Sequence, residues 1–219
     1  MNRTVRTAVA IAASLGCGML HAQQPGQPDP LFKLDAQSRV QIEAILDSAR
    51  HDSLPGRPLR SKAYEGIVKQ ANGQQVLREV RKLFGDLKQA RAALGPAADS
   101  GALEAGADAL YAGVIKPEDL VKFKPGPKTA ASPASALTYL SDLIQYRGVA
   151  REDATPAFSK LWQDGADDAE FKGLWQSVDQ DILSGVSPST ALQDQVRKIP
   201  GRGRGGDTSS PSTDPHAHG

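Results

Sequence analysis

The acidic segment DGADDAE, residues 164–170, is the densest group of side chains that could do chemistry. Its carboxylates belong to Asp164, Asp167, Asp168 and Glu170; they could bind calcium, or two of them could act as an acid/base pair. The spacing is not that of an EF-hand, and acidic residues before a helix commonly cap it and oppose the positive end of its dipole. We therefore predict helix capping for this segment and no metal site.

Histidine is scarce after residue 22, where it occurs only as His51, His216 and His218. His51 follows a helical pattern, and a cation there would suit the negative end of the helix dipole. His216 and His218 lie in a low-complexity tail and could hold a transition metal only weakly. The sequence contains no Gly-x-Ser-x-Gly or Ser-x-x-Lys nucleophile motif and no phosphate loop. We predict no catalytic residue and no cofactor.

Charged side chains could instead form an interaction surface. Lys62, Glu65 and Lys69 lie on one helical face, although a local Glu65–Lys69 pair explains their spacing equally well. Residues 57–91 hold nine basic and three acidic residues (9 − 3 = +6), and residues 152–181 hold two basic and eight acidic (2 − 8 = −6). We predict that the basic face, including Arg78 and Arg81, meets either this acidic segment or an acidic partner.

The first 22 residues have the pattern of an export signal. Arg3 and Arg6 precede an uncharged apolar run, and Ala22 stands at a plausible cleavage point. Cleavage would leave 24 basic and 25 acidic residues, a net charge of −1 that gives no general attraction to nucleic acid. Cys17, the only cysteine, offers an alternative, a lipoprotein anchored through an acylated cysteine. We predict a periplasmic or secreted protein without a transmembrane helix.

The remaining pattern is helical throughout, with no strand signal. In one predicted helix, apolar residues 4, 3, 4, 3 and 4 positions apart form a continuous stripe, namely Val76, Val80, Leu83, Leu87, Ala90 and Leu94. In another, capped by Asp35, the predicted inner face comprises Val40, Ala44, Ile45 and Ala49. We predict a flexible lead-in at 23–34, helical halves at 35–123 and 134–199, a Pro/Gly linker at 124–133, and a disordered tail at 200–219.

A Gly-Val pair recurs at Gly113, Gly148 and Gly185, each time before a helix-starting residue. Glycine ends helices by adopting the left-handed conformation, and the valine can then pack back onto the finished helix. The glycines are 35 and 37 residues apart, a separation found in arrays of helix pairs. The fold class is therefore all-α, an irregular bundle or a degenerate array of αα-hairpins with about eight to nine helices.

The segment LPGRPLRSKAYEGIVK, residues 54–69, resembles a segment of exported bacterial proteins of unknown function. The resemblance is clearest over residues 35–94 and weaker up to residue 192. Those proteins usually continue into Gly-Val-Pro, where this chain has Gln70, Ala71 and Asn72. The resemblance implies an all-helical exported protein and assigns no activity to a residue.

Together these features favour a non-enzymatic scaffold or interaction module of the cell envelope, whose partner is a protein or an envelope component. Two alternatives stay open. One is a hydrolase or lyase that acts on an envelope polymer through carboxylates such as Glu65 or Asp167. The other is a lipid-anchored assembly factor that uses Cys17.

Overall fold

The computed structural model describes residues 29–127 and 129–199. Within these ranges the chain forms nine α-helices, two short 3-10 helices and no strand, which confirms the all-α prediction. The predicted signal peptide with Cys17 and the predicted tail with His216 and His218 lie outside the described residues. The elements in chain order are η1 (Pro30–Lys33), α1 (Ala36–His51), α2 (Arg57–Val68), α3 (Gly73–Leu94), α4 (Ser100–Tyr111), α5 (Pro117–Leu120), η2 (Val121–Phe123), α6 (Pro133–Gln145), α7 (Arg151–Gln163), α8 (Asp168–Leu183) and α9 (Pro188–Lys198).

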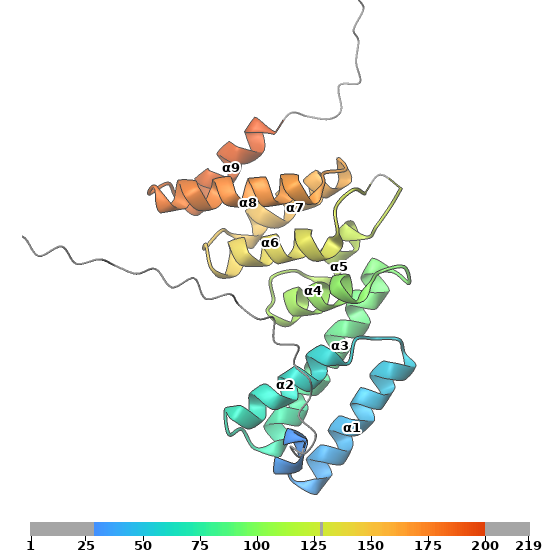
Figure 1. Ribbon diagram of the computed structural model, residues 1–219. Helices are drawn as coiled ribbons and strands as arrows, with labels where there is room; N and C mark the ends of the chain where they lie inside the picture. The colour runs from blue at the N-terminus through green and yellow to red at the C-terminus, as the bar shows by residue number, and fades with distance from the viewer. Residues whose placement is uncertain (1–28, 128, 200–219) are drawn as a thin grey trace, which may run out of the picture.

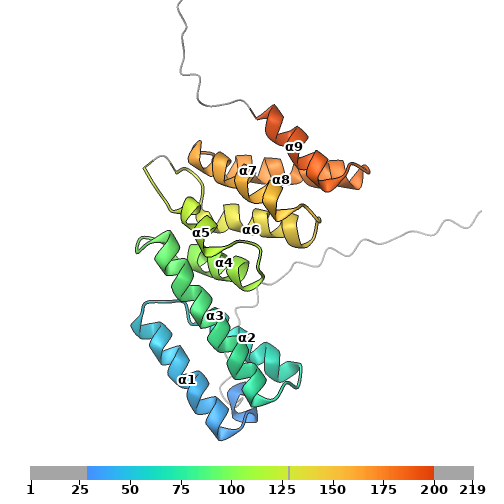
Figure 2. The same ribbon diagram turned by 180° about the vertical axis from the view of Figure 1, so that it is seen from behind.

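The helices are stacked in layers that follow the order of the chain (Figures 1 and 2). Helix α3 packs against α1 and α2 on one side and against α4 on the other, and α4 packs against α6. Helix α6 then contacts α7 and α8, and α9 lies over α8 and α7 at the C-terminal end. The two predicted halves thus pack together through α4 and α6, while a domain division at 124–133 stays a prediction.

The long helix α3 is the centre of the N-terminal layers, as its apolar stripe predicted. All six stripe residues are buried, namely Val76, Val80, Leu83, Leu87, Ala90 and Leu94. Helix α4 approaches closely because it presents Gly106, where an added Cβ would lie 3.2 Å from Ala90 Cβ and 3.3 Å from Leu94 Cδ1. The absence of a side chain at residue 106 therefore sets the spacing between α3 and α4.

The predicted inner face of α1 is only partly right. Asp35 caps the helix as expected, accepting a hydrogen bond from Ser38 N–H at 2.8 Å. Val40 (59% exposed) and Ala44 are exposed, however, and the residues buried in the core are Ile42, Leu46 and Ala49. The apolar residues of α1 cover more than one stripe, so the contact with α3 decides which stripe is buried.

The lead-in predicted at 23–34 is described by the structure only from residue 29, and this part differs from the prediction. Residues 29–34 are not an irregular segment: they include the 3-10 helix η1, which Asp29 caps through a hydrogen bond from Leu31 N–H at 2.9 Å. Leu31 is buried in the main core, so this short helix is part of the folded unit. Three apolar residues after a Gln- and Pro-rich stretch, namely Leu31, Phe32 and Leu34, are too few to show the helical periodicity that could have predicted it.

The helix-ending glycines adopt the predicted conformation, with φ of 70° at Gly113, 71° at Gly148 and 94° at Gly185. At the first of these turns, the valine after the glycine contacts the helix that has just ended, as predicted: Val114 N–H donates to Ala109 O at 2.8 Å. Two earlier turns use the same left-handed conformation without glycine, at Ser53 (φ 54°) and Gln70 (φ 57°). Whether the hairpins are degenerate repeats stays a prediction.

An aromatic cluster holds the C-terminal layers together. The ring centroids lie 5.5 Å apart for Phe158 and Phe171, 6.0 Å for Phe123 and Trp162, and 6.4 Å for Trp162 and Phe171. These rings come from η2, α7 and α8, and all four are buried. Aromatic rings at such distances add to the stabilisation that their burial provides.

Candidate functional site

The lysines that flank Glu65 on α2 form the local ion pairs that their spacing indicated. Lys62 Nζ lies 2.8 Å from Glu65 Oε2, and Lys69 pairs with the other carboxylate oxygen. The hydrogen bonds from Lys62 and then Lys69 lower the pKa of Glu65 to about 2. Glu65 is therefore ionised at neutral pH and cannot serve as the proton donor of a hydrolase.

Lys62 has a second contact that sequence reasoning missed. Its Nζ lies 4.8 Å from the ring centroid of Tyr111, and Lys82 Nζ lies 3.7 Å from the same centroid. The Tyr111 hydroxyl donates to Glu79, and Lys82 donates to Tyr111 O at 2.8 Å. Burial and the neighbouring Glu79 carboxylate raise the pKa of Tyr111 to about 12. Tyr111 therefore joins α2, α3 and α4, and Lys62 is part of this structural contact.

Arg78 and Arg81, the other two predicted interaction residues, lie on the exposed side of α3. Arg81 donates a hydrogen bond to Gln41 of α1. The basic segment 57–91 forms its long-range ion pairs at 2.6 to 3.4 Å, and their carboxylates all lie outside 152–181: Arg57–Glu104, Arg60–Asp29 and Lys88–Asp52. Among the described residues, the basic segment thus does not meet the predicted acidic segment through an ion pair.

The carboxylates of the acidic segment bind donors of the protein itself. Asp167 and Glu170 form a capping box at the start of α8, each accepting the other's backbone N–H at 2.9 Å. Asp168 accepts Ser132 N–H at 2.9 Å, and Asp164 pairs with Lys160 at 2.8 Å. The capping prediction is confirmed, and the chain segment before α6 is tied to the start of α8.

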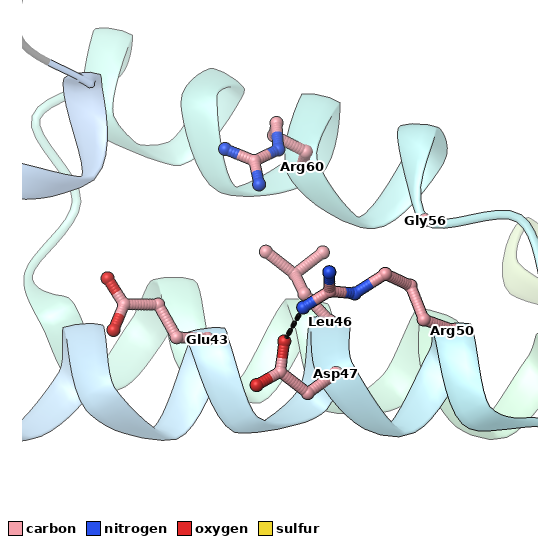
Figure 3. A pocket seen from close by; sticks show the side chains of 6 residues that line it. All are labelled: Glu43, Leu46, Asp47, Arg50, Gly56 and Arg60. Carbon is pink, nitrogen blue, oxygen red and sulfur yellow. Dashed lines mark hydrogen bonds and ion pairs between the residues drawn. The ribbon is translucent and has the colours of Figure 1, made fainter.

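A cleft between α1 and α2 is lined by several charged groups. Both helices pack on α3 but make few contacts with each other, which leaves a pocket of about 380 Å³. Figure 3 shows Arg60 extending from α2 towards α1, with Leu46 between the two helices. The lining residues are Glu43, Leu46, Asp47, Arg50, Gly56 and Arg60.

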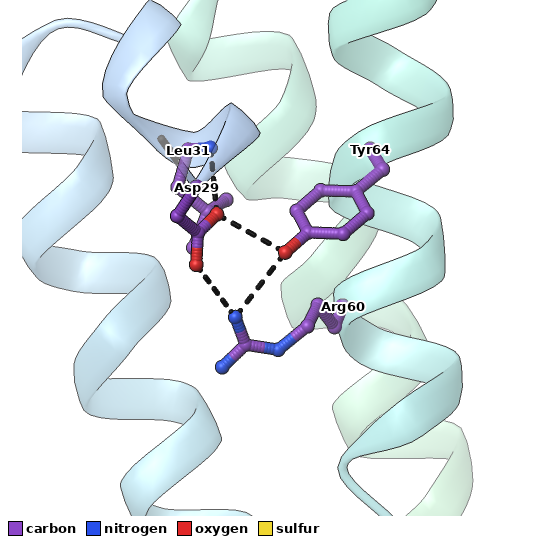
Figure 4. A network of polar contacts seen from close by, with 4 residues as sticks. All are labelled: Asp29, Leu31, Arg60 and Tyr64. Atoms are coloured by element: carbon purple, nitrogen blue, oxygen red, sulfur yellow. Dashed lines mark hydrogen bonds and ion pairs between the residues drawn. The ribbon is translucent and has the colours of Figure 1, made fainter. Parts of the chain in front are cut away.

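Arg60 is held in place on one wall of the cleft by a polar network (Figure 4). Its Nη1 lies 2.8 Å from Asp29 Oδ2 and 3.3 Å from the Tyr64 hydroxyl, and that hydroxyl donates to Asp29 Oδ1 at 3.0 Å. Burial opposes ionisation of Asp29, but hydrogen bonds from Leu31 N–H and Tyr64, together with Arg60, lower its pKa below the ordinary value. Arg60 is therefore a positioned guanidinium.

The opposite wall comes from one face of α1. Asp47 and Arg50 form an ion pair there, and Glu43 lies one turn earlier on the same helix (Figure 3). The cleft thus has the Arg60 guanidinium on the α2 wall, and Arg50 with two carboxylates on the α1 wall beside Leu46. This combination suits a polypeptide segment that carries charged and apolar side chains. Sequence reasoning missed this site because its residues have the ordinary pattern of a solvated helix face.

Comparison with known proteins adds no further assignment to this geometry. No protein-family model, no curated protein and no solved structure matches the chain. The resemblance of residues 54–69 to exported helical proteins therefore stays a prediction. The α1/α2 cleft, with Arg60 fixed on one wall and Leu46 between the helices, is the candidate functional site on its own geometry.

Proposed function

We propose that this chain is a non-enzymatic, exported helical scaffold that binds a segment of another envelope protein in the α1/α2 cleft. The observation that carries the proposal is the placement of charged groups of both signs around an apolar side chain in an open cleft between two helices. The cleft lies on a rigid support, because α1 and α2 are both packed on the buried stripe of α3.

Arg60 is the central recognition residue in this proposal. Asp29 and Tyr64 bind Nη1 of its guanidinium, whereas no described group bonds to Nη2 or Nε. Because a guanidinium presents its donors in a planar fork, Arg60 can bind a partner carboxylate without releasing Asp29. Arg50, whose side chain is 77% exposed, offers a second cation on the opposite wall. Because Glu43 and Asp47 line the same cleft, the partner segment that fits best carries a carboxylate for these arginines and a basic side chain for Glu43.

The binding proposal is tested with the mature protein, residues 23–219, as bait in an envelope extract. Captured proteins are identified by mass spectrometry, purified, and titrated by calorimetry against the wild type, Arg50→Glu, and the double variant Arg78→Glu/Arg81→Glu. We expect Arg50→Glu to weaken binding at least about tenfold and the α3 variant to bind like the wild type. Lys172→Glu on α8 is the matched control for a charge reversal far from the cleft.

Two outcomes would count against the cleft. If the α3 variant loses binding and Arg50→Glu does not, the partner binds the basic face of α3 instead. If no purified envelope protein binds saturably, the scaffold function is rejected. Circular dichroism of each variant verifies that the helical content is unchanged.

Export to the periplasm or medium is the second part of the proposal and rests on the sequence of residues 1–22. Within the described residues, the helices are too short or too polar to cross a lipid bilayer. Mass spectrometry of the protein recovered from a fractionated bacterium separates the alternatives. A chain that begins at Gln23 supports a cleaved signal, an acylated chain that begins at Cys17 supports the lipoprotein alternative, and an intact Met1 contradicts both.

A further inference from the structure

The segment that precedes α1 determines where the Arg60 guanidinium lies. The 3-10 helix η1 packs against α2 and α1, and its Leu31 is buried in the main core. Asp29, the cap of η1, thereby comes within hydrogen-bond distance of Arg60 and Tyr64 on α2 (Figure 4). The position of Arg60 therefore depends on the docking of residues 29–34.

Arg60 is bound through a single nitrogen, by two groups that do not line the cleft. The Tyr64 hydroxyl gives its one proton to Asp29 Oδ1, so it accepts from Arg60 Nη1 at 3.3 Å. Asp29 Oδ2 accepts from the same Nη1 at 2.8 Å. The three side chains thus form a closed ring of hydrogen bonds, which holds the guanidinium at the α2 wall.

A competing carboxylate lies in the cleft itself. Glu43 lines the pocket from the α1 wall and forms no ion pair with another described residue, whereas Asp47 is paired with Arg50 (Figure 3). A guanidinium released from Asp29 would face this unpaired carboxylate, and the two opposite charges attract each other. An Arg60–Glu43 pair would cross the cleft and occupy the space that a partner segment needs.

We propose that Asp29 and Tyr64 are positioning residues for the α1/α2 cleft: by holding Arg60 through Nη1, they keep it from bridging to Glu43 and leave its other nitrogens for a partner carboxylate. Docking of residues 29–34 thus keeps the cleft open. A partner that binds these free nitrogens stabilises the docked segment in return, because Arg60 offers them only in that state. This inference rests on the proposed function, since it assumes that the partner binds in the cleft.

The substitution Asp29→Asn tests the positioning role. Asparagine keeps an oxygen that can accept Leu31 N–H and so cap η1, but its amide nitrogen is a donor and cannot accept from Arg60. The readout is the Nε–Hε NMR signal of Arg60 in the ¹⁵N-labelled protein of residues 23–219, assigned with Arg60→Lys. Glu43→Gln should leave this signal unchanged when Asp29 is present and should shift it in the Asp29→Asn background, because Arg60 pairs with Glu43 only there.

Two further backgrounds complete the NMR comparison. Tyr64→Phe removes only the hydroxyl and should give a smaller response of the same kind, which keeps the test decisive if Asp29→Asn fails to fold. Asp99→Asn is the matched control, because Asp99 caps α4 by accepting Ala102 N–H and forms no ion pair with another described residue. In this control the Arg60 signal should ignore Glu43→Gln. An equal response to Glu43→Gln in every background, or none in any, would refute the positioning role.

The effect on binding is measured with the envelope protein that the capture experiment identifies. Calorimetry should show at least about tenfold weaker binding to Asp29→Asn than to the wild type, and unchanged binding to Asp99→Asn. Equal binding to the wild type and to Asp29→Asn would overturn this inference and leave the proposed function standing. If no envelope protein binds, the role in binding is overturned together with the proposed function, while the NMR comparison still decides what holds Arg60.

Discussion

A pair of glycine-to-alanine substitutions tests whether backbone conformation alone fixes the helix ends. Gly113 ends α4 with φ of 70°, and Gly85 lies inside α3 with helical φ. An added Cβ would meet no heavy atom within 4 Å at either position. The two substitutions therefore add the same methyl group to open space, and they differ only in the conformation that the new residue must adopt.

The expected effects have opposite signs. Alanine in the left-handed conformation costs about 1–2 kcal/mol, and the lower entropy of the unfolded chain returns about 0.4–1 kcal/mol, so Gly113→Ala should lower the free energy of unfolding by about 1 kcal/mol. In a helix interior, alanine is favoured over glycine by about 0.5–1 kcal/mol, so Gly85→Ala should raise it by that amount. The two variants should thus differ by about 1.5–2 kcal/mol.

Urea denaturation followed by circular dichroism at 222 nm measures both changes against the wild type. At about 2–4 °C per kcal/mol for a chain of this size, the melting temperatures should move in opposite directions by a few degrees. If both variants change the free energy of unfolding in the same direction, side-chain packing rather than backbone conformation determines the effect of alanine at these two positions. The account of the helix ends would then be wrong.

Four other substitutions have definite expected results. Ser53→Gly and Gln70→Gly relieve the two non-glycine left-handed turns and should each raise the free energy of unfolding by about 0.5–1 kcal/mol, measured by urea denaturation. Glu65→Gln removes a carboxylate whose pKa is lowered from 4.5 to about 2, so its stabilisation is present above pH 4.5 and is lost as the pH falls towards 2. Because 42% of this side chain is exposed, we expect a loss of at most about 1 kcal/mol at pH 7, which disappears in acid melts. Phe158→Ala opens a cavity beside Phe171 and should cost about 3–5 kcal/mol, and a loss below 1 kcal/mol would show that the aromatic cluster repacks.

The sequence predicted those features that depend on a local pattern. The stripe of α3 repeats over about five turns, and the left-handed helix ends at Gly113, Gly148 and Gly185 favour glycine, so both predictions are confirmed. The predicted inner face of α1 was wrong at Val40 and Ala44, because two apolar stripes competed and only the contact with α3 selects one.

The candidate sites could not be predicted in the same way. The cleft exists because α1 and α2 diverge on α3, and nothing in the spacing of Glu43, Asp47 and Arg50 specifies that divergence. The position of Arg60 depends on Asp29, 31 residues earlier in the chain. Sequence reasoning instead selected Lys62 and Glu65, whose spacing is regular because they form an ordinary ion pair within one helix.

The layered order of the helices has a consequence for how the protein opens. Each layer is made mainly of segments close together in the chain, so the contacts close short loops, and folding should be fast for a protein of this length. Helix α9 is the outermost layer, contacts mainly α8 and α7, and fully buries only Ala191 and Leu192. Its amides should exchange with deuterium well before those of α3, because this terminal layer can detach while the layers around α3 stay intact.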